Sequence, residues 1–269
     1  MLKGKEGEPF TPIPPSKLTV LARVAVREVF RPFIPYNIVG DAGGLVRAEQ
    51  LQRDGYGAVI FFNHFSKRDI FQIFENVIFA QPAMLESTIL TPEAYHQRRL
   101  VGDVLASLLA IHARLIVTSD TLRIPKYQHL RQGLGLKTYI RDAAKVLAAG
   151  GTVVLSPQAG RRSSLLGEDP QGAVELLTNA LRIKGIDRVA FTFIGLSLAE
   201  VTDYRDPQVA EYNIGRSFDV ALGPTYTLQE ARTKIGGGRF AMDRWILQEL
   251  SPLVPTAYLG NETAPKPFR

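Results

Sequence analysis

A histidine and an aspartate with four residues between them (an HX4D motif) are the first side chains whose spacing suggests chemistry. They are His64 and Asp69, in the stretch GAVIFFNHFSKRD that begins at Gly57. On one straight helix the two side chains would point about 140° apart. They can meet only if His64 lies at a strand end and Asp69 in the first turn of a following helix. Asp69 can then accept the ring N–H, which leaves the other ring nitrogen as a base near neutral pH.

The same residues have a purely structural interpretation. Ser66-Lys67-Arg68-Asp69 fits the S-x-x-[DE] capping box, in which Asp69 only satisfies a backbone donor. The surrounding pattern favours the catalytic interpretation, because a buried strand precedes the pair, with Asn63 before the histidine and Ser66 inside the motif.

The elements around the pair are those of an α/β sheet. Ala58–Phe62 is an uncharged apolar run after a glycine, which predicts a strand buried on both faces. A helical pattern follows, with Ile70, Ile73, Phe74, Val77 and Ile78 at three- and four-residue steps. The carboxyl end of a strand, where it opens a helix, is where α/β sheets place their ligands.

A second stretch, GTVVLSPQAGRRS from Gly151 to Ser163, repeats this architecture. A buried strand, Thr152–Leu155, runs into a Pro/Gly turn that carries Arg161 and Arg162. Arginines beside glycine-exposed backbone N–H groups suit a phosphate monoester. The alternative is an arginine pair on a solvated loop. Parallel strands carry their ligands side by side at their carboxyl ends, so we expect this turn to lie beside His64.

The segment NHFSKRD resembles the NHxSxxD block of the glycerolipid acyltransferases, the superfamily of lysophosphatidate and glycerol-3-phosphate acyltransferases. The resemblance implies that His64 is the general base that deprotonates an acceptor hydroxyl and that Asp69 orients it. It implies an acyl-CoA or acyl carrier protein as donor, a hydroxyl acceptor such as lysophosphatidate, and neither cofactor nor metal. On this interpretation Asn63, Phe65 and Ser66 lie on the substrate side of the site.

The other blocks of that family are matched less well. The second stretch resembles FPEGTRS: Pro157 matches the proline, Gln158 stands where the glutamate belongs, and the remaining candidates for substrate binding are Gly160, Arg161, Arg162 and Ser163. In the second block, Ser119 occupies the place of an arginine, for which only Arg123 or Lys126 could substitute. Residues 253–260 resemble the closing LPPxYxG phrase. These departures motivate an alternative: an acyltransferase-like protein that binds lipid or phosphate without turnover.

The remaining pattern predicts an α/β fold with a mainly parallel central sheet flanked by helices. We expect an N-terminal arm and amphipathic helix (1–35), an acyltransferase-like domain (36–260) and a C-terminal tail (261–269). Further strands are expected at Tyr36–Gly40, Leu85–Leu90, Leu115–Val117, Val189–Ile194 and Phe218–Leu222, and helices at Pro92–Ala113 with Thr91 as cap, Lys137–Ala149 closed by Gly150, Ala173–Lys184 and Arg239–Leu253. A turn at Asp41–Gly44 and a linker at Glu49–Gly57 complete the first half.

The first helix is expected to run from Ser16, its N-cap, to about Arg31 before Pro32. One face carries Leu18, Leu21, Ala22, Ala25 and Val29, and the opposite face carries Arg23, Arg27 and Arg31. Such a helix can lie on an anionic membrane surface through residues 16–31, or pack on its own domain. Residues 1–15 are expected to form an arm outside the core.

Composition narrows the classes of function. The 269 residues include no cysteine, which excludes disulfides and thiol catalysis, and the net charge of +6 favours anionic partners. No apolar run is long enough to span a membrane, so we expect a cytoplasmic protein, either free or peripheral on the inner face of the cell membrane. Gly195–Ala199 lacks the final glycine of a serine-hydrolase elbow, and Gly133–Thr138 lacks the GK[ST] sequence of a P-loop. Nucleic-acid modules and metal motifs are missing. Six of fourteen phenylalanines lie between 61 and 79, and part of this cluster is expected to line an acyl slot, Phe65 above all.

Overall fold

A seven-stranded, mostly parallel sheet organises the chain in the computed structural model. The structure describes residues 10–33, 36–64, 73–94, 106–157, 172–198, 217–238 and 240–255. The strand order is β1-β7-β6-β2-β5-β3-β4. The strands are β1 (Tyr36–Gly40), β2 (Gly57–Phe62), β3 (Ile89–Ala94), β4 (Ile111–Ile116), β5 (Thr152–Leu155), β6 (Val189–Leu198) and β7 (Phe218–Thr227).

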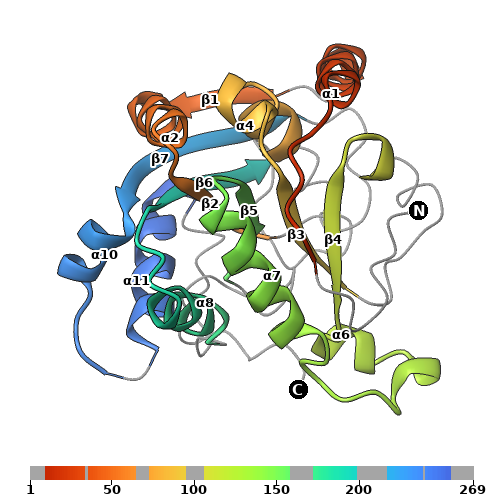
Figure 1. The fold of residues 1–269 in the computed structure, drawn as a ribbon, viewed down its shortest axis with the longest axis vertical. Helices are drawn as coiled ribbons and strands as arrows, with labels where there is room; N and C mark the ends of the chain where they lie inside the picture. Colours follow the sequence, from red (N-terminus) through yellow and green to blue (C-terminus); the bar gives the residue numbers. More distant parts are fainter. Residues whose placement is uncertain are drawn as a thin grey trace.

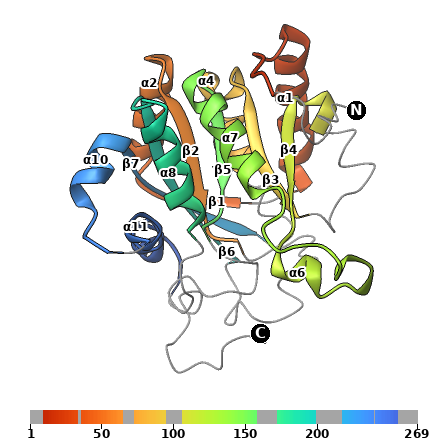
Figure 2. The ribbon, with the colours of Figure 1, turned by 60° about the horizontal axis from the view of Figure 1, so that its bottom comes forward.

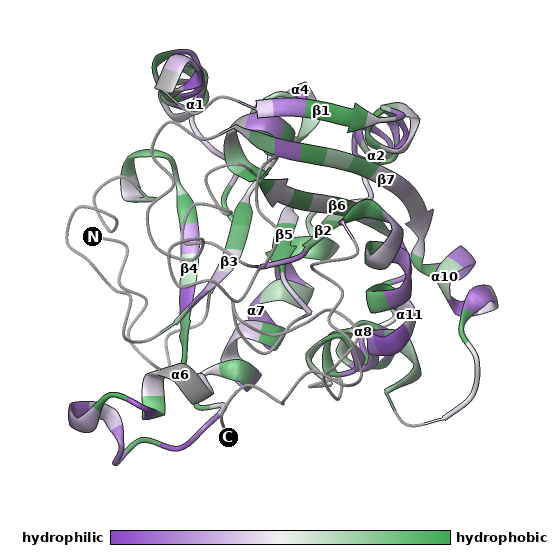
Figure 3. Ribbon diagram, turned by 180° about the vertical axis from the view of Figure 1, so that it is seen from behind, coloured by the Kyte–Doolittle hydropathy of each residue, from purple (hydrophilic) through white to green (hydrophobic). Residues whose placement is uncertain are grey.

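Strands β2 to β6 all run parallel, while β7 runs antiparallel to β6 and carries β1 parallel to itself. Every residue of β2, β5 and β6 is buried, as expected of central strands covered on both faces. The α/β class with a mainly parallel sheet is therefore confirmed. In Figure 3 the central strands carry mainly hydrophobic residues.

Helices cover both faces of the sheet (Figures 1 and 2). One row contains α7 (Leu136–Ala148), α8 (Ala173–Ile183) and α11 (Ala241–Leu250), which pack in that order, with α7 on β2, β3, β4 and β5 and α11 on β6 and β2. The other row contains α1 (Lys17–Phe30), α2 (Gly43–Arg53) and α4 (Pro82–Leu85). The short elements are η1 (Arg31–Phe33), the π-helical turn η2 (Phe74–Ile78), α6 (Ser119–Leu122), η4 (Pro125–Tyr127), α10 (Leu228–Lys234) and η5 (Ser251–Leu253).

Several predicted elements are confirmed with little change. Strands β1 and β5 have the expected bounds, and β2, β6 and β7 begin within one residue of their predicted starts. Helix α7 ends before Gly150, whose φ of +75° is the left-handed conformation that glycine adopts after a helix. Part of the phenylalanine cluster between 61 and 79 was expected to line an acyl slot, and its members Phe61, Phe62, Phe74 and Phe79 are buried in the main hydrophobic core. Phe65 and Phe71 lie outside the described residues.

The predicted helix Pro92–Ala113 is wrong at both ends. Residues 92–94 belong to β3, which also takes Thr91, the expected cap, and residues 111–113 belong to β4. The strand expected at Leu85–Leu90 begins instead at Ile89, because α4 occupies the residues up to Leu85. The stretch expected to be a turn and a linker contains helix α2, and helix α10 was not predicted.

The N-terminal segment packs more closely than expected. Phe10 is buried in the core, its ring meets the ring of His112 edge-on at 5.0 Å between centroids, and the Arg114 guanidinium lies over it. Lys145 on α7 donates a hydrogen bond to the carbonyl of Phe10. The expectation that residues 1–15 form an arm outside the core is therefore wrong at Phe10.

Helix α1 has the predicted N-cap, because the Ser16 hydroxyl accepts the Thr19 N–H at 3.1 Å. The structure decides its orientation, which the sequence left open. Arg23, which was placed on the polar side, is fully buried, whereas Leu18 and Leu21 are exposed. The arginine side of α1 therefore faces the protein.

Candidate active site

Asn63 and His64 follow directly on β2, at the carboxyl edge of the parallel strands. The buried Asn63 amide donates to the carbonyl of Leu196 at 2.7 Å, and its Oδ1 accepts the N–H of Leu196 at 2.6 Å. The backbone ladder between β2 and β6 ends at Phe62 and Ile194. The Asn63 side chain thus extends the pairing beyond the last backbone partner, which fixes the point where the chain leaves the sheet.

We call the two hydrogen bonds between Asn63 and Leu196 the Asn63 clamp. His64 is the next residue after this clamp and is half-buried. Its ring meets the ring of Phe62 edge-on, with 5.9 Å between the centroids and an interplanar angle of 69°. A half-buried imidazole at a strand end can exchange a proton with a bound molecule, because it is held by an aromatic neighbour and still reached from outside. The predicted placement of His64 at the end of a buried strand is confirmed.

The second predicted stretch emerges beside the first. Strands β2 and β5 are adjacent and parallel, with Phe61 opposite Leu155. Counting two residues further along each strand brings Asn63 level with Pro157, so the two polar turns leave the sheet at one edge. The adjacency of the two strand ends agrees with the rule for parallel strands, and the position of Arg161 and Arg162 relative to His64 stays a prediction.

The segment around η5 (Ser251–Leu253) packs on β6 and β7 near the end of β2. A methyl group at Gly195 would collide with the carbonyl oxygen of Leu253, and one at Gly223 would collide with the Leu253 side chain. Leu253 in η5 therefore lies against β6 and β7, beside the residue that Asn63 clamps. Leu253 is also the first residue of the stretch that resembles the closing LPPxYxG phrase. The glycines in β6 and β7 are the signal that a segment packs closely on them.

The other end of the second stretch is also anchored. Helix α8 begins after residues 158–171, and its first-turn N–H groups of Val174 and Glu175 donate to the buried carboxylate of Asp243 on α11 at 3.4 and 2.8 Å. Burial raises the pKa of Asp243, while these backbone hydrogen bonds act in the opposite direction. The arginine-bearing stretch thus connects two fixed points, the end of β5 and the start of α8.

Most of the predicted site residues lie outside the described part of the chain. This is true of Asp69, Phe65, Ser66, Gln158, Gly160, Arg161, Arg162 and Ser163, so the structure describes only Asn63, His64 and Pro157 of the predicted set. The second-block candidates Ser119, Arg123 and Lys126 follow β4, which is separated from β5 by β3. They therefore follow a strand two positions away from β5 in the sheet, and three positions away from β2.

Other candidate sites fit the structure less well. Ser197 lies inside strand β6 and is buried, so it does not occupy the exposed turn that a hydrolase nucleophile requires. Among the described residues, no three histidine, aspartate or glutamate side chains gather as metal ligands. No helix in the described part of the chain has the length and hydrophobicity to cross a membrane.

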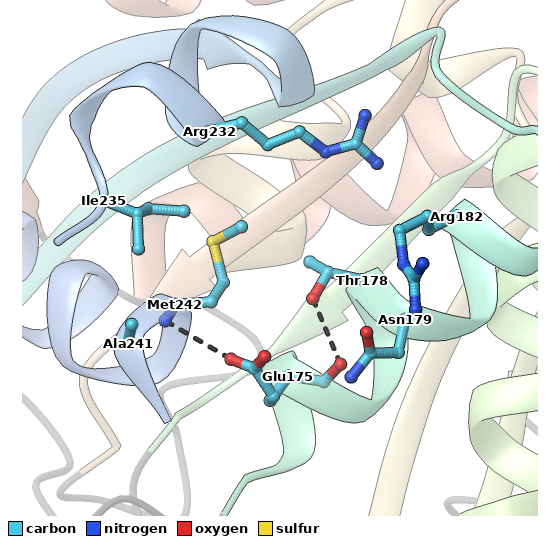
Figure 4. Close-up of a pocket in the computed structure, with 8 residues that line it drawn as sticks. All are labelled: Glu175, Thr178, Asn179, Arg182, Arg232, Ile235, Ala241 and Met242. Carbon is cyan, nitrogen blue, oxygen red and sulfur yellow. Dashed lines mark hydrogen bonds between the residues drawn. The ribbon is translucent and has the colours of Figure 1, made fainter. Parts of the chain in front are cut away.

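A small open groove of about 160 Å³ lies among α8, α10 and α11 (Figure 4). Its lining residues are Glu175, Thr178, Asn179, Arg182, Arg232, Ile235, Ala241 and Met242. Arg232 is paired with Asp187 at 3.0 Å, and the Glu175 carboxylate accepts the N–H of Met242 at 3.4 Å. Because Asp187 precedes β6 and α10 follows β7, Arg232 lies near the amino end of β6, at the edge opposite Asn63.

Comparison with known proteins adds no assignment to this geometry. No protein-family model matches the chain, and no curated protein is significantly similar to it.

Proposed function

We propose that the chain is an acyltransferase that moves a fatty acyl group from acyl-CoA or acyl carrier protein to a hydroxyl of a phosphorylated lipid precursor such as lysophosphatidate. The observation that supports it is the shared edge of β2 and β5. There His64 follows one buried strand and the arginine-bearing stretch follows its neighbour. A base and a phosphate-binding segment at one edge are what acyl transfer to such an acceptor needs.

In the proposed reaction His64 removes the proton of the acceptor hydroxyl as its oxygen attacks the thioester carbonyl. The tetrahedral intermediate collapses with cleavage of the C–S bond, and the leaving thiolate recovers the proton from the imidazolium. The products are an ester and a free thiol. Asp69 orients the imidazole, and Arg161 with Arg162 hold a phosphate of the acceptor or of the donor. The proposal includes a cytoplasmic location on the inner face of the membrane, because the donors are water-soluble and the acceptors are lipids.

The test is thiol release from labelled acyl-CoA with lysophosphatidate, other lysolipids and glycerol phosphate as acceptors. The chain has no cysteine, so a thiol reagent reports only on the product. We expect His64→Gln to reduce kcat by about 10²–10⁴-fold, the range of general-base catalysis. The matched control is His129→Gln, which removes an exposed imidazole after β4 and should keep full turnover. Full turnover by His64→Gln would refute the mechanism.

The phosphate contact has its own test. Replacing Arg161 and Arg162 together by Ala should raise KM for a phosphorylated acceptor and leave KM for an uncharged lysolipid unchanged. Arg182→Ala and Arg232→Ala are the controls, since Arg232 lies near the opposite edge of the sheet and Arg182 lines the same groove. An unchanged KM would place the phosphate site elsewhere.

The alternative, a protein that binds lipid or phosphate without turnover, is motivated by Gln158 and Ser119, which replace a glutamate and an arginine of the family pattern. The same assay separates the two functions. An idle protein would bind labelled acyl-CoA or lysolipid in equilibrium dialysis but release no thiol with any acceptor.

A further inference from the structure

Helix α1 presents a stripe of apolar side chains to solvent. Leu18, Leu21 and Val29 are 75, 65 and 59% exposed, and Ala25 between them is also exposed. At about 100° per residue these four positions share one side of the helix, which we call the α1 stripe. It is about 16 Å long at 1.5 Å per residue. All three ribbon views place α1 at the periphery of the molecule, as Figure 3 shows.

The opposite side of α1 is fastened to the protein by arginines. The buried Arg23 donates from Nε to the carbonyl of Leu109 at 2.9 Å, and from its terminal nitrogens to the carbonyls of Leu85, Ser87 and Ala110. Arg27 donates to the carbonyl of Phe79 at 3.0 Å. Rolling the helix to bury the α1 stripe would pull a guanidinium away from four carbonyl oxygens. These hydrogen bonds therefore keep the α1 stripe on the outer side of the helix.

An outward apolar stripe is unfavourable in water unless another surface covers it. Burial of a leucine or valine side chain ordinarily stabilises a fold, and here the packing gives up that gain at three large side chains. A stable protein–protein interface buries about 800 Å² on each partner and uses 20–30 residues. The α1 stripe, four residues on one convex helix, is much smaller than that, whereas its width suits insertion at a lipid–water boundary.

The charge around the stripe indicates which lipid surface fits. Lys17 and Arg31 are exposed at the two ends of α1, and the whole chain carries a net charge of +6. The exposed Glu28 between them is paired with Arg27 at 2.6 Å. Cations at the ends of an apolar stripe can reach anionic headgroups while the apolar side chains enter the acyl boundary. We therefore infer that the α1 stripe docks the protein on an anionic lipid bilayer, while the hydrogen bonds of Arg23 hold the helix in the required orientation. This inference does not depend on acyl transfer.

The test is flotation of the full-length protein with vesicles of phosphatidylcholine and phosphatidylglycerol, and with phosphatidylcholine alone. The double variant Leu18→Ser, Leu21→Ser should lower the partition coefficient for the mixed vesicles at least about tenfold, since two leucines leave the boundary. The control is Ile183→Ser, which removes an equally exposed apolar side chain from α8. Lys17→Gln with Arg31→Gln should weaken binding to the anionic vesicles and leave the weak binding to neutral vesicles unchanged. Equal binding by the leucine variant and the wild type would overturn the inference.

A single cysteine in this cysteine-free chain identifies the occupant directly. Leu21→Cys labelled with an environment-sensitive dye should shift to the blue when anionic vesicles are added. A dye that is already shifted without lipid would mean that another segment of the chain, or a second copy, covers the stripe, and would contradict lipid docking. Sedimentation of the same sample separates those two occupants. Neither readout requires turnover, so failure here is distinguishable from failure of the proposed reaction.

Discussion

The side chain of Asn63 pairs with the backbone of Leu196 in both directions, donating at 2.7 Å and accepting at 2.6 Å. The amide thereby replaces a further backbone pair between β2 and β6 beyond Phe62 and Ile194. Because the side chain completes the ladder, the backbone at His64 can turn away from the sheet. The half-buried His64 is the next residue after this pair.

Asn63→Ala removes both hydrogen bonds and leaves a buried N–H and C=O of Leu196 without these partners. We expect the free energy of unfolding to fall by about 2–4 kcal/mol, from about 1–3 kcal/mol for each unsatisfied group with partial relaxation. We also expect kcat to fall, because His64 loses its fixed exit from the strand. Urea unfolding and thiol release measure the two effects.

The matched control is Asn37→Ala on the edge strand β1, where the amide donates to Asp219 at 3.0 Å in an exposed setting. That change should alter stability by less than about 1 kcal/mol and leave turnover unchanged. If Asn63→Ala were as stable and active as Asn37→Ala, the clamp would have no role in holding His64.

Gly195→Ala tests the packing of the C-terminal segment on the site. The added methyl group would collide with the carbonyl oxygen of Leu253, so either β6 or η5 must move. We expect a loss of about 1–3 kcal/mol in the free energy of unfolding, the usual cost of overpacking. Gly237→Ala is the control, since a methyl group there meets open space. Equal stability of the two variants would show that η5 shifts without cost.

The sequence predicted where the candidate site lies in the sheet, but not the contacts that hold its residues. Uncharged apolar runs ending in polar turns located the ends of β2 and β5, and the parallel rule brought them together. The partner of Asn63 could not be predicted, because Leu196 is a buried strand residue that offers only its backbone. A sequence pattern carries no information about which main-chain group a side chain will meet 133 residues away.

The errors in the fold have particular causes. Thr91 and Pro92 have the sequence signature of a helix start, yet both belong to β3. In the described residues Pro92 is paired with Arg114 of β4, but β5 pairs with β3 only at Ile89 and Leu90, so on that side of β3 a missing N–H is tolerated. Gly44 was interpreted as part of a turn. It is needed because a side chain there would collide with the carbonyl of Gly223 where α2 crosses β7.

The orientation of α1 shows what periodicity leaves open. The spacing of Leu21 and Arg23 correctly places them on different sides of the helix, but it does not say which side faces the protein. The carbonyl groups before β3 and β4 decide it, because they form a polar socket for Arg23. Tertiary contacts of this kind override the usual preference for burying leucine.

Arg23→Met tests that socket. Burial lowers the pKa of Arg23 to about 10, so the guanidinium stays charged at neutral pH. Methionine fills the space but leaves the carbonyls of Leu85, Ser87, Leu109 and Ala110 without their donor. We expect a loss of about 2–4 kcal/mol in urea unfolding, since relief of the buried charge offsets part of the cost.

The control for the socket is Arg31→Met, which changes an exposed arginine directly after the last residue of α1 and should alter stability by less than about 0.5 kcal/mol. Arg23→Lys should recover only part of the loss, because an ammonium group cannot reach several carbonyls in different directions. Wild-type stability of Arg23→Met would mean that α1 is held by its other contacts.

His112 gives the fold a predictable acid response. Burial lowers the pKa of this imidazole below its usual value of 6.5, and the charges of Arg114 and Arg23 lower it further. Between the folded pKa and about 6.5 the unfolded chain binds the proton and the native protein does not. The free energy of unfolding must therefore fall as the pH drops through that window, by at most about 1.4 kcal/mol per pH unit from this group.

Replacing His112 by Gln should flatten the dependence of the free energy of unfolding on pH, measured by urea unfolding between pH 7 and pH 5.5. The exposed His129→Gln should keep the wild-type slope. If His112→Gln and the wild type lost stability in parallel over this range, another group would control the acid sensitivity of the segment that anchors Phe10.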